Sequence, residues 1–251
     1  MGSIMNNTMI NTVTAFHPIW GRIKFNRVKS LFIFSLLLLL SGWSLTTYAS
    51  FKLESTTVIL KESEGRASFT IDNTSANPIL LVTKLVDLDG KSLSKQILIS
   101  PPVTRIDAGQ SQQVNFVLKK GTVLDTEVLL KASFEGVEQV PGNATVMPIR
   151  QEIGFFIQPN AVPQIKTPWQ ELVFSTSGNN LIIKNPSKHV VRLGPQVILA
   201  PSNEVVALGN PYIMPGASKQ FPIKSSPTSV KMTPLSRYGF AQAEVAIPVT
   251  H

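Results

Sequence analysis

Catalytic side chains are scarce in this sequence. Its 251 residues include three histidines and no cysteine, which excludes thiol catalysis, zinc–thiolate sites and iron–sulfur clusters. Outside the N-terminal region only His189 and His251 remain, and a Ser-His-Asp arrangement would need one of them. His189 follows the turn-like residues 185–188, where we expect a solvated surface histidine. These residues predict no catalytic site, no metal site and no cofactor.

Paired carboxylates do not change this expectation. Glu62/Glu64 and Asp87/Asp89 lie two residues apart in turn-like segments, where solvated side chains are expected rather than the acid and nucleophile of a glycosidase. Phosphate-binding glycine loops, zinc-protease motifs and calcium-loop spacings are missing from the sequence. An esterase-like enzyme built on His189 is therefore only the third alternative.

The net charge of +8 is unevenly distributed. Residues 1–49 hold Arg22, Lys24, Arg27 and Lys29 without one acidic residue, so half of the charge lies there. An apolar run over residues 30–43 follows, shorter than a bilayer span, and small residues occupy the −3 and −1 positions, Thr47 and Ala49. We predict a signal peptide over residues 1–49, cleaved after Ala49; an uncleaved N-terminal anchor is the alternative.

Cleavage would leave 202 residues without a stable membrane anchor, with basic residues scattered among acidic ones. No basic stripe with interleaved aromatic residues remains, so no nucleic-acid partner is expected.

The mature part reads as all-β. Its apolar residues alternate or run in short stretches, and it holds 17 of the 18 prolines, which long helices tolerate poorly. Regularly spaced strands with turn signals at Asp89-Gly90 and Ala108-Gly109 are typical of an immunoglobulin-like sandwich. The strands predicted in this first domain, residues 50–158, are 55–60, 66–73, 79–86, 96–99, 112–118, 127–138 and 144–157.

A second β-sandwich is predicted beyond a short linker. Residues 159–166 are proline-rich and polar, which suits a stiff connection, and residues 167–251 return to strand patterns. The strands predicted there are 172–175, 180–185, 190–197, 205–208, 212–214, 219–223, 230–233 and 241–249.

The segment 143–157 is about twice the usual strand length. In strand geometry Thr145, Met147 and Ile149 share a face with Ile153 and Phe155, and Arg150 and Glu152 point to the other face. Pro148 cannot donate to a ladder, which favours a sheet edge. A long apolar edge strand indicates strand addition by another chain; an ordinary core strand is the alternative.

At these residues the sequence resembles the PapD-like periplasmic chaperones of the chaperone-usher pathway. The resemblance covers essentially all of the mature chain and rests on motifs in the family's order. They are residues 100–109 with Gln113 and Val114, and residues 127–134, 153–159, 181–186, 214–222 and 236–239.

The resemblance implies two immunoglobulin-like sandwiches at an angle, in a periplasmic protein that lends an edge strand to pilus or fimbrial subunits and passes them to an outer-membrane usher. By position, Thr145, Met147 and Ile149 match the residues that the family inserts into the subunit. A free edge strand also allows a self-capped dimer. A secreted two-sandwich adhesin or structural module is the alternative.

Two departures from the family pattern stand out. The family's two basic residues that bind the subunit's C-terminal carboxylate fall here on Thr57 and Gly154, which carry no charge. Arg150 or Lys131 could substitute, with a solvated place on the sheet face as the alternative for each. The family's interdomain ionic contact falls on Glu127, Gln158 and Arg237, which predicts a single Glu127–Arg237 bridge; a solvated Arg237 is the alternative.

Overall fold

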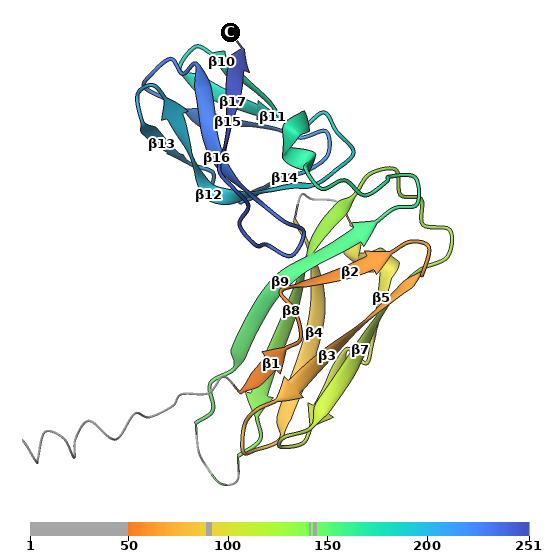
Figure 1. Ribbon diagram of the computed structural model, residues 1–251. Helices are drawn as coiled ribbons and strands as arrows, with labels where there is room; N and C mark the ends of the chain where they lie inside the picture. The colour runs from red at the N-terminus through yellow and green to blue at the C-terminus, as the bar shows by residue number, and fades with distance from the viewer. Residues whose placement is uncertain (1–49, 89–91, 141, 143–144, 251) are drawn as a thin grey trace, which may run out of the picture. The chain divides into compact units, whose positions relative to one another are not determined.

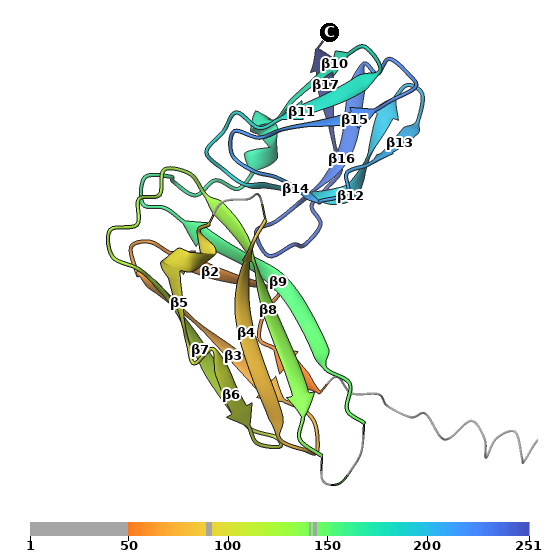
Figure 2. The same ribbon diagram turned by 180° about the vertical axis from the view of Figure 1, so that it is seen from behind.

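The computed structural model describes residues 50–88, 92–140, 142 and 145–250, and strands dominate this part of the chain (Figures 1 and 2). Strands β1–β9 build one sandwich and strands β10–β17 build another. The predicted signal peptide and the predicted turn at Asp89-Gly90 lie outside the described residues.

The first sandwich consists of two sheets. In the first sheet the strand order is β1-β3-β7-β5, and in the second it is β2-β9-β8-β4-β6. A short 3₁₀ helix, η1 (Ser94–Gln96), precedes β5. The strands are β1 (Phe51–Leu53), β2 (Thr57–Lys61), β3 (Arg66–Asn73), β4 (Ile79–Asp87), β5 (Ile97–Ser100), β6 (Val103–Ile106), β7 (Ser111–Leu118), β8 (Val128–Glu138) and β9 (Ile149–Gln158).

Alternation of apolar and polar residues holds these two sheets together. Phe69 on β3 and Phe116 on β7 are buried between polar or partly exposed neighbours, as expected for strands with one face in a core. The Phe69 ring stacks on Phe134 at a centroid distance of 5.3 Å, and Phe116 meets Phe155 at 4.9 Å. Aromatic rings from both sheets therefore fill the first core.

The second sandwich is a continuous sheet of eight strands in the order β13-β12-β16-β17-β10-β11-β15, with β14 paired to β12. Parallel pairing of Phe174 with Val249 joins β10 to β17, and a 3₁₀ helix, η2 (Pro168–Glu171), places Trp169 in this second core. The strands are β10 (Val173–Ser177), β11 (Asn180–Lys184), β12 (Val191–Ala200), β13 (Glu204–Ala207), β14 (Tyr212–Ile213), β15 (Ser218–Pro222), β16 (Ser229–Leu235) and β17 (Val245–Thr250).

Each strand expected from the sequence has a counterpart among these seventeen, and the all-β prediction is confirmed. The sequence did not predict β1, of three residues, or β6, of four residues. The last strand begins at Val245 instead of at residue 241, since Ala241 makes only an isolated bridge to Leu235. In the described part, no helix has the length and hydrophobicity needed to cross a membrane.

A close approach between the two sheets explains one glycine and yields a prediction. A Cβ at Gly136 on β8 would lie 2.8 Å from two ring carbons of the buried Phe51, whereas at Gly194 on β12 the nearest atom would be at 3.5 Å. We expect Gly136→Ala to lower the free energy of unfolding by about 1–3 kcal/mol, because the Phe51 ring must shift. Gly194→Ala is the control and should change stability by less than about 1 kcal/mol. Urea denaturation measures both, and equal stability of the two variants would contradict this packing.

Candidate functional site

Strand β9 has one complete and one incomplete side. On one side it pairs antiparallel with β8 from Ile149↔Gly136 to Ile157↔Val128. On the other side it pairs parallel with β2, but only from Gly154↔Thr57 to Gln158↔Lys61. Within the described residues, no strand covers that side over residues 149–153, which we call the open edge of β9. Figure 1 shows β2 beside only the later part of β9. An open edge presents unpaired main-chain groups to another chain.

The chain before β9 corrects one prediction. The strand was expected to begin at residue 144, yet residues 145–148 carry no strand, and residues 143 and 144 lie outside the described residues. Pairing with β8 stops at Ile149, and the preceding Pro148 has no N–H to continue the ladder. Thr145 is exposed, the Met147 side chain is 83% exposed and Ile149 is 39% exposed. The three predicted subunit-binding residues therefore lie together at the surface, at and before the first residue of β9.

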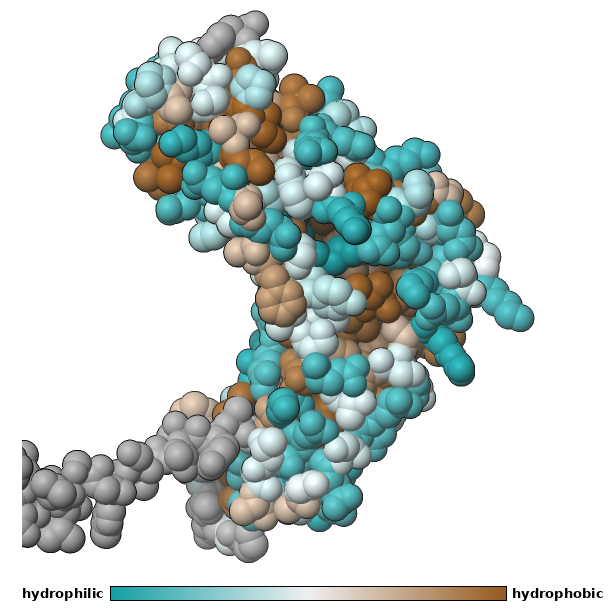
Figure 3. All heavy atoms as spheres, viewed as in Figure 1, coloured by the Kyte–Doolittle hydropathy of each residue, from teal (hydrophilic) through white to brown (hydrophobic). Residues whose placement is uncertain are grey.

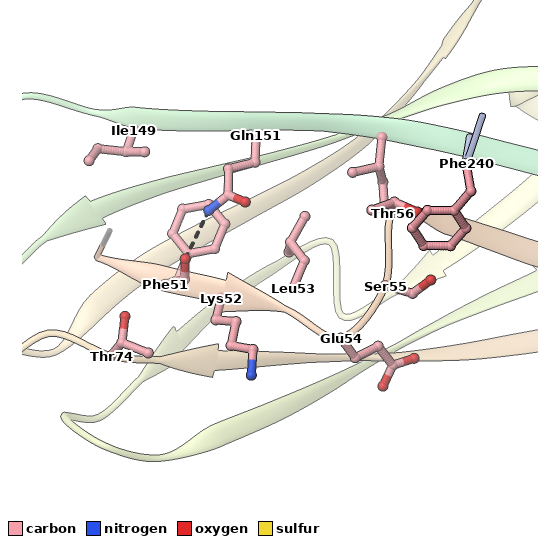
Figure 4. Close-up of a pocket in the computed structure, with 11 residues that line it drawn as sticks. Phe51, Lys52, Leu53, Glu54, Ser55, Thr56, Thr74, Ile149, Gln151 and Phe240 are labelled. Atoms are coloured by element: carbon pink, nitrogen blue, oxygen red, sulfur yellow. Dashed lines mark hydrogen bonds between the residues drawn. The ribbon is translucent and has the colours of Figure 1, made fainter. Parts of the chain in front are cut away.

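An open groove of about 750 Å³ runs beside this edge. It separates β1 from β9, because the chain leaves the first sheet after Leu53 and enters the second at Thr57. Ile149, Gln151 and Ile153 line one wall of the groove, and Gln151 Nε2 donates to the Phe51 carbonyl at 2.8 Å (Figure 4). In Figure 3 brown hydrophobic patches interrupt the polar surface over these strands. The apolar face of the open edge is thus accessible.

The outer face of β9 carries two ion pairs. Lys131 Nζ lies 2.9 Å from Glu152 Oε2, and Arg150 Nε lies 2.7 Å from Glu135 Oε2. These side chains are between 29% and 59% exposed, and the Glu135 carboxylate raises the pKa of the Arg150 guanidinium through a hydrogen bond. Both cations considered as carboxylate anchors from the sequence therefore already have carboxylate partners on a solvated sheet face.

The two positions where the family has basic residues meet in space. Thr57 and Gly154 are direct partners in the β2–β9 pairing. The cation beside them is Arg192 of β12, whose Nη1 donates to Thr57 Oγ1 at 3.2 Å. No sequence pattern links Arg192 to this site, because 135 residues separate it from Thr57. The only signal for it was the absence of a side chain at residue 154.

A buried carboxylate joins the two sandwiches. Glu127, just before β8, lies beside Arg237 from the turn after β16, so the structure contains the hypothesised ion pair. The other carboxylate oxygen of Glu127 accepts the Val190 N–H at 3.0 Å. Arg237 also contacts the Gln158 amide oxygen and lies 4.8 Å from the centre of the Phe156 ring. The three residues matched to the family's interdomain contact therefore meet.

His189 corrects another expectation. It is buried instead of solvated, with its Nδ1 3.4 Å from Glu127 Oε1. The turn folds inward because buried Asn185 donates through Nδ2 to the His189 carbonyl at 2.7 Å and to the Ile213 carbonyl at 3.0 Å. His189 thus lies against the Glu127 carboxylate, between the two sandwiches.

Comparison with known proteins agrees with this geometry. A family model described as "Pili and flagellar-assembly chaperone, PapD N-terminal domain" matches residues 50–163. An uncharacterized fimbrial chaperone of Escherichia coli K12, YhcA, is 34% identical over 201 residues, which cover 78% of this chain and 90% of the relative. Chaperone protein PmfD of Proteus mirabilis is 29% identical over 214 residues, covering 80% of this chain and 84% of the relative.

Solved structures match over both sandwiches. One is the Salmonella enterica SafA pilin in complex with the SafB chaperone, at a TM-score of 0.67 and 23% identity, covering 81% of this chain and 98% of the matched chain. The Escherichia coli chaperone DraB matches at a TM-score of 0.66 and 22% identity, covering 79% and 98%. At these identities the likeness shows a shared two-sandwich fold.

The buried ion pair generates a prediction. Glu127→Ala would leave the Arg237 guanidinium without its carboxylate partner and the Val190 N–H without its acceptor, so we expect a loss of about 3 kcal/mol in the free energy of unfolding. Glu152→Ala is the matched control, because its pair with Lys131 is exposed and contributes little. Urea denaturation followed by circular dichroism compares the two. A Glu127→Ala protein as stable as the Glu152→Ala protein would show that the buried pair does not hold the sandwiches.

Proposed function

The chain belongs to the family of PapD-like fimbrial chaperones, and on that premise we propose that it acts in the periplasm, binding fimbrial subunits through the open edge of β9 and delivering them to an outer-membrane usher. The family consists of chaperones rather than enzymes, so we propose binding without a catalytic step. The predicted signal peptide, residues 1–49, would supply export to the periplasm, and residues 50–158, 159–166 and 167–251 would form the first domain, the linker and the second domain.

The half-covered side of β9 is the observation that carries this proposal. A subunit strand added along residues 149–153 would complete the ladder that β2 leaves unfinished. Each main-chain hydrogen bond would contribute about 1 kcal/mol. Covering the Met147 and Ile149 side chains would add about 1.5–3 kcal/mol for each side chain that becomes fully buried.

The unpaired state of residues 145–148 suits such a transfer. A segment without strand partners can extend into strand geometry when the subunit supplies a groove, at the cost of ordering its backbone. Binding is then strong enough to protect a subunit, and a competing strand can still displace the chaperone. The same edge could pair with a second copy of this chain to give a self-capped dimer.

No observation favours the alternative of a secreted adhesin. An esterase built on His189 is also disfavoured, because this side chain is buried against Glu127.

Replacing the apolar side chains of residues 145–149, at and before the start of β9, which we call the donor segment, tests the proposal. Met147→Ser combined with Ile149→Ser should lower periplasmic recovery of a co-expressed fimbrial subunit at least about tenfold. The reason is that burying the two side chains in the complex contributes more than the roughly 1.4 kcal/mol of binding free energy that corresponds to a factor of ten. The chaperone itself should keep its melting temperature, because both side chains are exposed in the free protein. Immunoblotting of periplasmic extracts measures the recovery.

Val123→Ser combined with Leu98→Ser is the matched control, since these side chains are similarly exposed, at 85% and 55%, away from β9. Unaltered subunit recovery with the Met147/Ile149 variant would refute strand donation by this segment.

A further inference from the structure

Arg192 is a half-buried cation without an acidic partner. Its Nη1 donates to the Arg237 carbonyl at 2.7 Å and to Thr57 Oγ1 at 3.2 Å. None of the ion pairs in the described part of the chain includes Arg192, and within it no hydrogen bond from Nη2 is found. The nearby Glu127 carboxylate is already engaged by Arg237 and the Val190 N–H.

Such a guanidinium is poised for an anion. Burial lowers the pKa of Arg192 from its usual range, and a cation removed from water normally has a counter-charge. Arg192 also lines a hollow of about 280 Å³ together with Lys166, Ser236 and Tyr238, so a ligand can reach it from solvent.

Two glycines beside Arg192, Gly154 and Gly239, leave room for its guanidinium. A Cβ at Gly154 would lie 3.5 Å from Nη1 and 3.3 Å from Thr57 Oγ1, so a long side chain at residue 154 would compete for this space. A Cβ at Gly239 would lie 3.1 Å from Nη2, and Gly239 has a φ of +84°, which L side chains rarely adopt. The guanidinium group of Arg192 therefore fits because both neighbouring positions are glycine.

The position of Arg192 matches the end of the open edge. From Gly154 onward β2 covers the side of β9, so a strand added along residues 149–153 has to stop beside Thr57. If it runs parallel to β9, as β2 does, its carboxyl end arrives there, whereas an antiparallel strand would bring its amino end toward a cation. A C-terminal carboxylate is the anion that fits this place.

We propose that Arg192, contributed by the second sandwich, binds the C-terminal carboxylate of the subunit strand and fixes its register on β9. This inference rests on the proposed function. It assigns to Arg192 the charge that Thr57 and Gly154 cannot supply, and it leaves Arg150 and Lys131 in their ion pairs on the outer sheet face.

The test uses a co-expressed fimbrial subunit in two forms, one with its native C-terminus and one extended by Gly-Ser beyond its last residue. With the native form, Arg192→Gln should lower periplasmic recovery about 10- to 100-fold, the range expected for a charge-assisted hydrogen bond. With the extended form, wild type and Arg192→Gln should recover equally little subunit, because the carboxylate is displaced from Arg192 in both.

Rescue and control variants separate binding from folding. Arg192→Lys should restore part of the recovery, and Arg192→Gln combined with Gly154→Lys should restore it by returning a cation to the β9 position. Arg66→Gln, an exposed arginine on β3, is the matched control and should behave as wild type. Melting temperatures should stay within about 4 °C of wild type for Arg192→Gln.

Each remaining outcome has a defined meaning. Two results would overturn the role of Arg192 and leave the proposed function unaffected. One is that Arg192→Gln recovers as much native subunit as wild type; the other is that Arg192→Gln lowers recovery of the native and the extended subunit by the same factor relative to wild type. A carboxylate-dependent loss with Arg150→Gln instead of Arg192→Gln would transfer the anchor to Arg150. If wild type fails to protect the native subunit, the proposed function fails, and the role of Arg192 fails with it.

Discussion

Main-chain hydrogen bonding along β9 is the constraint on which the binding surface depends. On one side β9 is paired with β8 from Ile149 to Ile157. On the other side of β9 the partner would come from the start of the chain, which passes from one sheet to the other. There β1 pairs with β3 in the first sheet, and β2 then pairs with β9 in the second. That change leaves residues 149–153 open and creates the groove lined by Phe51 and Ile153. The chain therefore folds without its partner while keeping one ladder incomplete.

Charge placement follows from the same arrangement. The exposed face of the β8–β9 pair carries Lys131 of β8 and Arg150 of β9 in solvated ion pairs, which contribute little to stability. The less exposed charges Glu127, Arg237 and Arg192 lie where the two sandwiches meet. Two of them form an ion pair, and Arg192 has no acidic partner within the described residues. Glu127 and Arg237 compensate one another, so this pair can connect the domains. Within the described residues Arg192 has no carboxylate partner. It is therefore the cation that we propose for the C-terminal carboxylate of the subunit.

Part of this was predictable because it depends on local pattern. Alternation in segments such as β3 and β7 indicated which side chains face a core, and the same period of two placed Met147 and Ile149 on one face. Their interpretation as subunit-binding residues came from the family resemblance. The predicted strand began too early because alternation continues through residues 145–148, although Pro148 and the end of pairing with β8 leave those residues without a ladder. His189 was misjudged because a turn sequence does not reveal what packs over the turn.

The sequence by itself determined the all-β class, the two-sandwich organisation, the apolar residues at Met147 and Ile149, and the absence of charge at Thr57 and Gly154. Each of these follows from residues close together in the chain or from the order of motifs. The Glu127–Arg237 pair joins residues 110 positions apart, and the sequence predicted it only through the family resemblance. Only the tertiary structure showed that Arg192 reaches Thr57 across 135 positions. Such contacts depend on how two folded sandwiches pack and on the space that Gly154 leaves open, and neither property is carried by any short stretch of the chain.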